Sequence, residues 1–147
     1  MPSDELPTRP VRPAPARRGS GAVLLAEDDP AVRLFARRSL ESAGYTVFAA
    51  AGAEEAIHAS ENWSSSIEVL VTDIVMPGMH GHELAKLIRQ TRPGIGIVLM
   101  SGYTDHSLAR DSGIGDFEFL NKPFTIAALT NAVGRAADAA RRSATQP

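Results

Sequence analysis

The chain has 147 residues, 44% of them hydrophobic and 22% charged, which is the usual size and composition of one globular domain. It contains no cysteine, which excludes disulfides, thiolate zinc sites, iron–sulfur clusters and thiol nucleophiles. No apolar run approaches the roughly 18 residues that cross a bilayer, and the N-terminus lacks the apolar core of a signal peptide, so we expect a cytoplasmic protein without membrane insertion.

Charge is distributed unevenly along the chain. The formal net charge is −2, but residues 1–20 and 126–147 each carry +2, which leaves −6 on residues 21–125. An acidic body argues against direct nucleic acid binding, because phosphate backbones select basic surfaces. Residues 1–20 hold five of the ten prolines and no apolar periodicity, which predicts a disordered Pro/Arg-rich tail or linker. The spacing of Pro7 and Pro10 leaves a polyproline docking peptide as an alternative.

From residue 21 onward, short apolar runs alternate with amphipathic stretches. The runs are rich in Val, Ile and Leu and lack an alternation of polar and apolar residues, which is typical of strands buried on both faces of a parallel sheet. The expected strands are Ala22–Ala26, Tyr45–Ala49, Ile67–Val71, Ile95–Met100 and Phe117–Leu120.

The amphipathic stretches are the expected helices. They are Pro30–Ala43, Ala53–Ser60, Gly81–Thr91, a short helix near Thr104–Arg110, and Thr125 to about Arg141. In the first of them, the pattern places Val32, Leu34, Phe35 and Leu40 on one side and Arg33, Arg37 and Arg38 on the other. Five strand and helix units predict a single doubly wound five-stranded parallel α/β sheet with helices on both faces. We place this domain at residues 21–139 and a C-terminal tail at 140–147.

Polar residues follow four of the five expected strands. In an open parallel sheet, functional residues gather at the carboxyl ends of the strands. The second strand ends in alanines, so we expect it at the margin of the sheet. The polar residues at the other four ends are Glu27, Asp28, Asp29, Asp73, Ser101 and Lys122.

The acidic residues in this set call for a cation. Carboxylates about 4 Å apart repel by roughly 4 kcal/mol per pair at an effective dielectric of about 20. Oxygen ligands without thiols select a hard cation such as Mg²⁺. For Glu27, Asp28 and Asp29 alone, capping of the helix that starts at Pro30 is an equally good interpretation. Asp73, at the end of a buried run, favours the metal site.

Four sequence blocks lie at the ends of the expected strands: Leu24–Asp29, Val71–Met79, Leu99–Gly102 and Leu120–Phe124. In order, spacing and position they resemble the signature blocks of the response-regulator receiver domain of two-component signalling. The resemblance covers roughly residues 21–139 and implies a flavodoxin-like receiver fold. The sequence around Ser101 is similar to that of receivers of hybrid histidine kinases, whereas the initial methionine favours a single-domain response regulator.

The resemblance implies a role for each residue of the phosphorylation chemistry. Asp73 would be the phosphoacceptor, a carboxylate that attacks the phosphohistidine of a histidine kinase or a histidine phosphotransfer protein. Lys122 would pair with one phosphoryl oxygen, and Ser101 would hydrogen-bond another. Movement of Ser101 would be coupled to rotation of Phe119 and would control an unidentified output protein. Pro123 would follow a cis peptide bond.

The resemblance also implies a metal site. Asp28 and Asp73 would ligate Mg²⁺ together with the backbone carbonyl of Val75, and Glu27 would act through a metal-bound water. One departure from the family pattern is His80, which stands where an aspartate is common. We expect this difference to cost a helix cap.

Together these features predict a phosphorylation-controlled switch rather than an enzyme, with self-catalysed phosphotransfer, slow autodephosphorylation and no DNA-binding output domain. The alternative is a Mg²⁺-dependent phosphatase or phosphotransferase with an aspartyl nucleophile. Haloacid-dehalogenase-like and toprim-type sites have a second aspartate two residues after the first, where this chain has Val75. A flavodoxin-like cofactor module is disfavoured because the acidic run after the first strand would repel a phosphate.

Overall fold

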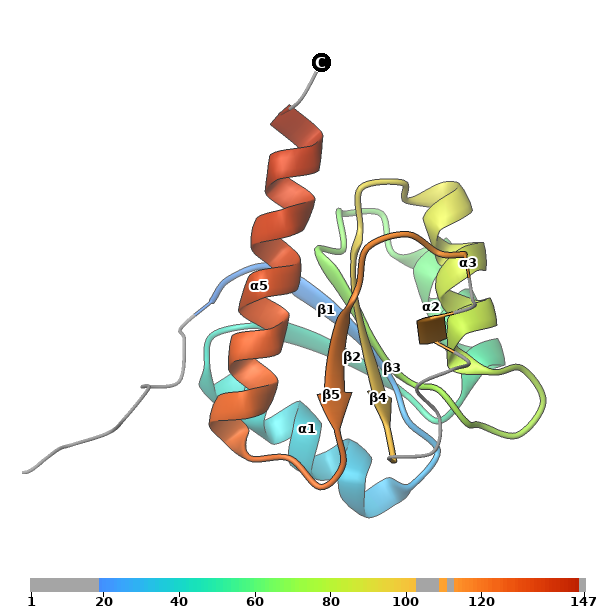
Figure 1. The fold of residues 1–147 in the computed structure, drawn as a ribbon, viewed down its shortest axis with the longest axis vertical. Helices are drawn as coiled ribbons and strands as arrows, with labels where there is room; N and C mark the ends of the chain where they lie inside the picture. Colours follow the sequence, from blue (N-terminus) through green and yellow to red (C-terminus); the bar gives the residue numbers. More distant parts are fainter. Residues whose placement is uncertain (1–18, 103–108, 111–112, 146–147) are drawn as a thin grey trace, which may run out of the picture.

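A computed structural model of the protein describes residues 19–102, 109–110 and 113–145. Its centre is a five-stranded parallel sheet in the order β2-β1-β3-β4-β5 (Figure 1). The predicted doubly wound sheet is therefore confirmed, and the strand that ends in alanines lies at an edge as expected. The strands are β1 (Ala22–Ala26), β2 (Thr46–Ala50), β3 (Val69–Asp73), β4 (Gly96–Ser101) and β5 (Glu118–Asn121).

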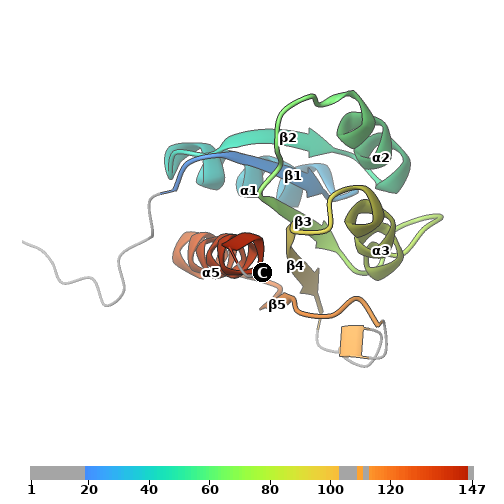
Figure 2. The same cartoon turned by 90° about the horizontal axis from the view of Figure 1, so that it is seen from above.

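Helices cover both faces of the sheet. One face carries α1 (Pro30–Ser42) and α5 (Ile126–Thr145), and the other carries α2 (Ala53–Asn62) and α3 (Gly81–Thr91) (Figure 2). The helix expected near Thr104–Arg110 lies outside the described residues except for Ala109 and Arg110, which are helical. α5 continues to Thr145, past the expected end near Arg141 and into the range expected to be a tail. None of the helices in the described part of the chain combines the length and the hydropathy of a membrane span.

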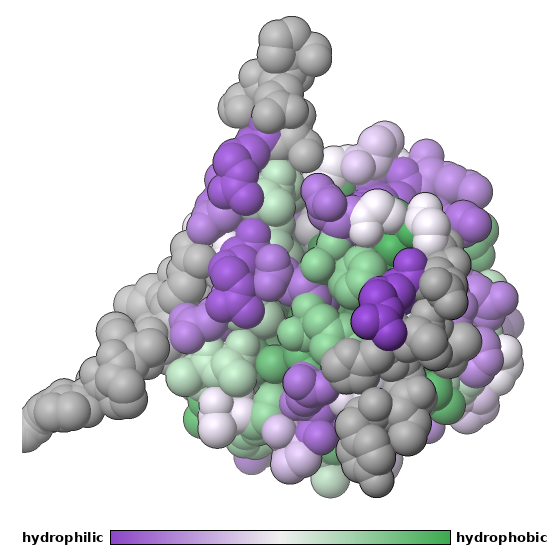
Figure 3. All heavy atoms as spheres, viewed as in Figure 1, coloured by the Kyte–Doolittle hydropathy of each residue, from purple (hydrophilic) through white to green (hydrophobic). Residues whose placement is uncertain are grey.

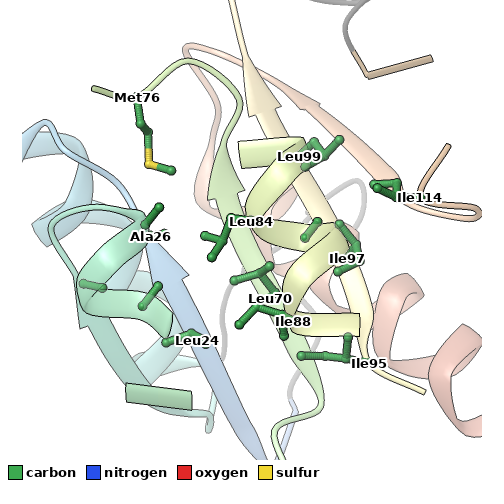
Figure 4. Packing of buried hydrophobic residues seen from close by; sticks show 14 of the residues in the cluster. Leu24, Ala26, Leu70, Met76, Leu84, Ile88, Ile95, Ile97, Leu99 and Ile114 are labelled. Atoms are coloured by element: carbon green, nitrogen blue, oxygen red, sulfur yellow. The ribbon is translucent and has the colours of Figure 1, made fainter. Parts of the chain in front are cut away.

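Two hydrophobic cores lie on the two faces of the sheet, because successive side chains of a strand point to opposite sides. On the α2 and α3 side, strand residues such as Leu24, Leu70 and Ile97 pack against Leu84 and Ile88 of α3 (Figure 4). On the other side, the alternate strand positions pack against α1 and α5, and they include Val23, Leu25, Val71, Val98 and Met100. The central strands are therefore apolar on both faces.

The uniform burial predicted for all five strands is wrong for the two edge strands. Every residue of β3 and β4 is buried, but in β2 both Thr46 and Phe48 are exposed, and in β5 Asn121 is exposed. An edge strand has one neighbour instead of two, and the helices cover the middle of the sheet best. Phe48 meets Trp63 edge to face, with ring centroids 6.4 Å apart, so Trp63 packs at the sheet margin.

The buried side of α1 differs from the side that we expected. Ala36, Ser39 and Leu40 are buried, whereas Leu34 is 45% and Phe35 is 41% exposed. At about 100° per residue, the stripe that contains Ala36 and Leu40 faces the sheet, and Leu34 and Phe35 lie off that stripe. Of the residues expected on one apolar side, Leu40 is therefore buried, whereas Leu34 and Phe35 lie at the surface. α5 is amphipathic in the same way, and Figure 3 shows hydrophilic residues along its outer side.

Candidate functional site

The register between β1 and β3 brings two acidic residues together at the carboxyl edge of the sheet. Ala26 is paired with Thr72, so Glu27 and Asp73 come at the next position of each strand. Glu27 is held in place by its N–H, which donates to the carbonyl of Ala50 at 3.0 Å. Both acidic side chains are buried, with 0% of Glu27 and 8% of Asp73 exposed.

The register between β4 and its neighbours adds a hydroxyl and an ammonium group. Asp73 is paired with Met100 of β4, and Ser101 of β4 is paired with Asn121 of β5. Lys122 follows directly, and its N–H donates to the carbonyl of Ser101 at 2.9 Å. Four strands thus deliver their terminal polar residues to one edge, as the sequence predicts.

The acidic residues divide into two groups with different surroundings. Carboxylate oxygens of Glu27, Asp28 and Asp73 all lie within 4.8 Å of one another, and they form the one three-acid cluster of this kind among the described residues. Asp29 caps α1 instead, because its Oδ1 accepts hydrogen bonds from the N–H groups of Ala31 at 2.9 Å and of Val32 at 3.4 Å. The capping interpretation therefore holds for Asp29.

Lys122 is the cation of the cluster. Its Nζ lies 2.8 Å from Oε1 of Glu27 and 3.0 Å from Oδ2 of Asp73. One ammonium against three carboxylates leaves an excess of two negative charges when all four groups are ionised. Hard oxygen donors with this excess of charge suit a divalent cation such as Mg²⁺.

Burial makes the ionised carboxylates costly. It raises the pKa of Asp73 and of Glu27, although the hydrogen bonds from Lys122 act in the opposite direction. Asp28 raises the pKa of Asp73 further, and Asp73 does the same to Glu27. For Lys122, burial alone would lower the pKa, but its hydrogen bonds to Glu27 and Asp73 outweigh burial and the pKa is raised. Lys122 therefore stays protonated at neutral pH.

The remaining predicted site residues lie around this cluster. Ser101 is fully buried, and its hydroxyl donates to the carbonyl of Gly102. Phe119 of β5 is partly buried and packs against the core on the α3 side. Val75 follows two residues after Asp73 and has an exposed side chain. The Lys122–Pro123 peptide bond is cis, as the resemblance implied.

The start of α3 shows what replaces the helix cap that we expected His80 to cost. His80 is the N-cap residue of α3, and its N–H donates to Oε1 of Glu83 at 2.9 Å. Glu83 also places an acidic group in the first helical turn, where it interacts favourably with the helix dipole. The expected loss of a cap is therefore offset by Glu83.

Two residues near the site were missed by the sequence analysis. A Cβ at Gly81 would lie 1.9 Å from the carbonyl oxygen of Asp73, so only glycine allows α3 to approach β3 this closely. Arg33 was assigned to the polar side of α1, but its Nη1 donates to the carbonyl of Glu27 at 2.8 Å. The position of Arg33 in the turn after an acidic run was the one signal available.

Comparisons with known proteins agree on one family. Residues 23–134 match the family model for the response regulator receiver domain. The chain is 40% identical over 116 residues to the sensor kinase CckA of Brucella abortus (strain 2308), which covers 78% of this chain and 12% of that protein. It is 34% identical over 117 residues to the transcriptional regulator NtrC of Escherichia coli (strain K12), covering 79% of this chain and 24% of NtrC.

A shorter relative matches almost from end to end. The chain is 37% identical over 112 residues to the response regulator receiver protein CpdR of Brucella abortus (strain 2308), covering 76% of this chain and 92% of CpdR. Among solved structures, a receiver protein from Sinorhizobium medicae WSM419 has a TM-score of 0.75 at 31% identity, covering 82% of this chain and 97% of that one. A CheY-like receiver domain protein from Methanospirillum hungatei JF-1 has a TM-score of 0.73 at 26% identity, covering 85% and 99%.

Proposed function

This chain belongs to the response regulator receiver domain family, and from that premise we propose that it is a phosphorylation-controlled switch whose phosphoacceptor is Asp73. Receiver domains of two-component systems take a phosphoryl group from a histidine kinase onto an aspartate. The observation that carries the assignment to Asp73 is its position. Its buried carboxylate lies at the end of the central strand β3, between Glu27 and Asp28, which follow β1, and Lys122, which follows β5.

The proposed reaction is a transfer between two nucleophiles. A carboxylate oxygen of Asp73 attacks the phosphorus of a phosphohistidine, the new O–P bond forms, and the P–N bond breaks with its electron pair moving to the imidazole nitrogen. Lys122 pairs with negative charge on the phosphoryl oxygens, because its raised pKa keeps it cationic. Its present partners, Glu27 and Asp73, already hold its Nζ at the edge where the phosphoryl group arrives.

The acidic cluster is the proposed Mg²⁺ site. Asp28, Asp73 and the backbone carbonyl of Val75 are the proposed protein ligands, and Glu27, the third acid of the cluster, would act through a metal-bound water. When bound, Mg²⁺ would neutralise part of the negative charge of the carboxylates and of the phosphoryl group. The support for this site is the clustering of three carboxylates with one ammonium group, together with the burial that raises the pKa of two of them.

Ser101 and Phe119 are the proposed switch residues. In this proposal the Ser101 hydroxyl, which donates to the carbonyl of Gly102, changes its hydrogen-bond acceptor to a phosphoryl oxygen on Asp73. Ser101 lies one residue beyond the position that pairs with Asp73, and β5 carries Phe119 beside β4. A phenylalanine has no hydroxyl, so its contribution to the switch comes from packing.

The phosphodonor needs a docking surface next to Asp73. Leu34, Phe35, Phe124 and Ile126 form an apolar surface, which we call the α1–α5 patch, and the rings of Phe35 and Phe124 lie 5.9 Å apart. Phe35, Phe124 and Lys122 line one open pocket of about 400 Å³. A protein that brings a phosphohistidine to Asp73 has to contact the surface around Lys122. We therefore propose the α1–α5 patch as the docking surface of a histidine kinase or a histidine phosphotransfer protein.

A labelling experiment tests the assignment. The protein is incubated with acetyl phosphate and Mg²⁺, and the mass of the intact chain is measured. We expect the addition of one phosphoryl group, which Asp73→Asn abolishes. Asp138→Asn, a change of a half-buried aspartate on α5 that pairs with Arg141, leaves the labelling intact. Labelling of Asp73→Asn to the wild-type level would show that another residue is the phosphoacceptor.

A further inference from the structure

Arg33 of α1 reaches back over the end of β1. Its Nη1 donates to the carbonyl of Glu27 at 2.8 Å and lies 3.5 Å from the carbonyl of Asp28. The side chain is partly buried, unlike the exposed Arg37 one turn later, which pairs with Glu41 at 3.2 Å. Arg33 therefore connects the helix to the backbone that carries two of the three clustered acids.

The loop from Glu27 to Asp29 is fixed from several sides. The N–H of Glu27 donates to Ala50 at 3.0 Å, and the N–H of Asp29 donates to Oε2 of Glu27 at 3.0 Å. Between these two points, Arg33 holds the carbonyl of Glu27, which belongs to the peptide unit that leads into Asp28. The side chain of Asp28 is exposed, so the direction of its carboxylate depends on the orientation of this backbone.

We propose that Arg33 is a positioning residue of the cation site: it orients the backbone of Glu27 and Asp28 so that the Asp28 carboxylate stays beside those of Glu27 and Asp73. The proposal rests on the proposed function, because that function requires Mg²⁺ at the cluster. Arg33 itself would contact neither the cation nor the phosphoryl group. Its effect is exerted through two backbone carbonyls.

A positioning role and the positive charge of Arg33 predict opposite effects on Mg²⁺ affinity. A guanidinium close to a cation site repels Mg²⁺, so charge alone predicts tighter Mg²⁺ binding after Arg33 is removed. Loss of positioning predicts weaker binding, because residues that orient metal ligands typically contribute about 10-fold or more to affinity. A purely structural role predicts a lower melting temperature of the metal-free protein with an unchanged Kd.

The test is a direct Mg²⁺ titration of the full chain. Binding is measured by calorimetry or by the amide chemical shifts of the loop that contains Asp28. For Arg33→Met we expect a Kd about 10-fold weaker than that of the wild type. Arg37→Met, which removes an equal charge from the same helix, should keep the wild-type Kd. A Kd for Arg33→Met that equals the wild-type value, or is tighter, would overturn the proposal. Melting of each metal-free variant reports its stability separately.

A second variant covers the case in which Arg33→Met does not fold. Arg33→Lys keeps the charge, but its ammonium nitrogen lies one bond closer to the backbone than Nη1 of arginine, which makes both carbonyl contacts, so the variant isolates positioning from electrostatics. Weaker Mg²⁺ binding by folded Arg33→Lys then supports the proposal, and wild-type affinity overturns it. Absence of Mg²⁺ binding to the wild type contradicts the proposed metal site itself, whereas equal binding by the wild type and the Arg33 variants contradicts the role of Arg33 alone.

Discussion

At the scale of single residues, the site concentrates negative charge in a buried place. Asp73 and Glu27 have raised pKa values because burial disfavours their ionised forms. Lys122 offsets part of this cost, with Nζ 2.8 Å from Glu27 and 3.0 Å from Asp73. The repulsion that remains among the carboxylates would be relieved by a further cation, in line with the proposed Mg²⁺ site.

This charge imbalance predicts that Asp73→Asn stabilises the metal-free protein at pH 7. A raised folded-state pKa contributes stability that is present below the unfolded value, 3.8 for an aspartate, and is lost as the pH rises through the folded value. Asparagine does not ionise, so the variant avoids this loss, and Lys122 keeps Glu27 as its partner. We expect a gain on the order of 1 kcal/mol, or about 2 to 4 °C in melting temperature.

The pH dependence of this gain provides the check. In metal-free buffer, the difference in melting temperature between Asp73→Asn and the wild type should shrink as the pH falls toward 3.8, because the wild-type carboxyl becomes protonated. Asp138→Asn serves as the control for loss of an acidic residue. A variant that melts below the wild type at pH 7 would contradict the prediction.

The close approach of Gly81 to the backbone of Asp73 gives a second prediction for a single residue. A Cβ at residue 81 would lie 1.9 Å from the carbonyl oxygen of Asp73, and this backbone atom has little freedom to move. Gly81→Ala should lower the free energy of unfolding by about 1 to 3 kcal/mol through overpacking, and it should slow labelling of Asp73. Gly94→Ala is the control, because no atom lies within 4 Å of a Cβ there. Chemical denaturation measures both variants, and equal stability of Gly81→Ala and the wild type would refute the clash.

At the scale of elements, the central strands were predictable and the helix faces were less so. In β1, β3 and β4 most positions are apolar and the polar ones lie at the carboxyl ends, so the pattern indicates burial on both faces without knowledge of the neighbours. The edge strand β2 and the surface residues Leu34 and Phe35 of α1 depend on which elements lie next to them. The tertiary arrangement, rather than local hydrophobicity, decides those positions.

Arg89 of α3 is a connection between elements that a local pattern does not reveal. Its guanidinium donates to the carbonyl of Ile95 at 3.1 and 3.3 Å, to that of Asp116 at 2.9 Å and to that of Ile114. Burial lowers its pKa, and Asp116 acts against this effect. α3 is thus joined to the start of β4 and to the segment that leads into β5, which carries Phe119.

We predict that Arg89→Met loosens this connection. The change keeps the aliphatic stem and removes the hydrogen bonds from the guanidinium to three carbonyls, so the free energy of unfolding should fall by about 1 to 3 kcal/mol. Amide hydrogen exchange should accelerate most at residues 114–121. Lys86→Met, at an exposed position of the same helix, should leave exchange unchanged. Uniform acceleration across the chain, without an excess at residues 114–121, would count against a local role of Arg89.

At the scale of the whole molecule, the sheet order brings together residues that are far apart in the sequence. Glu27, Asp73 and Lys122 meet because β1, β3 and β5 end at one edge, and the rule for parallel sheets was enough to predict this meeting from sequence. The rule does not predict distances. The place of Asp29 before Pro30 already indicated that it caps α1. The contact of Arg33 with the Glu27 carbonyl could not be predicted, because it depends on one side-chain conformation.

The meeting of three strand ends at one cluster predicts that Mg²⁺ stabilises the whole fold. A ligand that binds the native state alone at about 100 times its Kd adds roughly 2.7 kcal/mol to the free energy of unfolding. The melting temperature should therefore rise with Mg²⁺ concentration, and Asp28→Ala should lose most of this rise because it removes one of the three clustered carboxylates. Asp138→Asn should keep the full rise. Since monovalent salt screens repulsion without filling the site, a shift that KCl of equal ionic strength reproduces would be general screening and would refute a specific site.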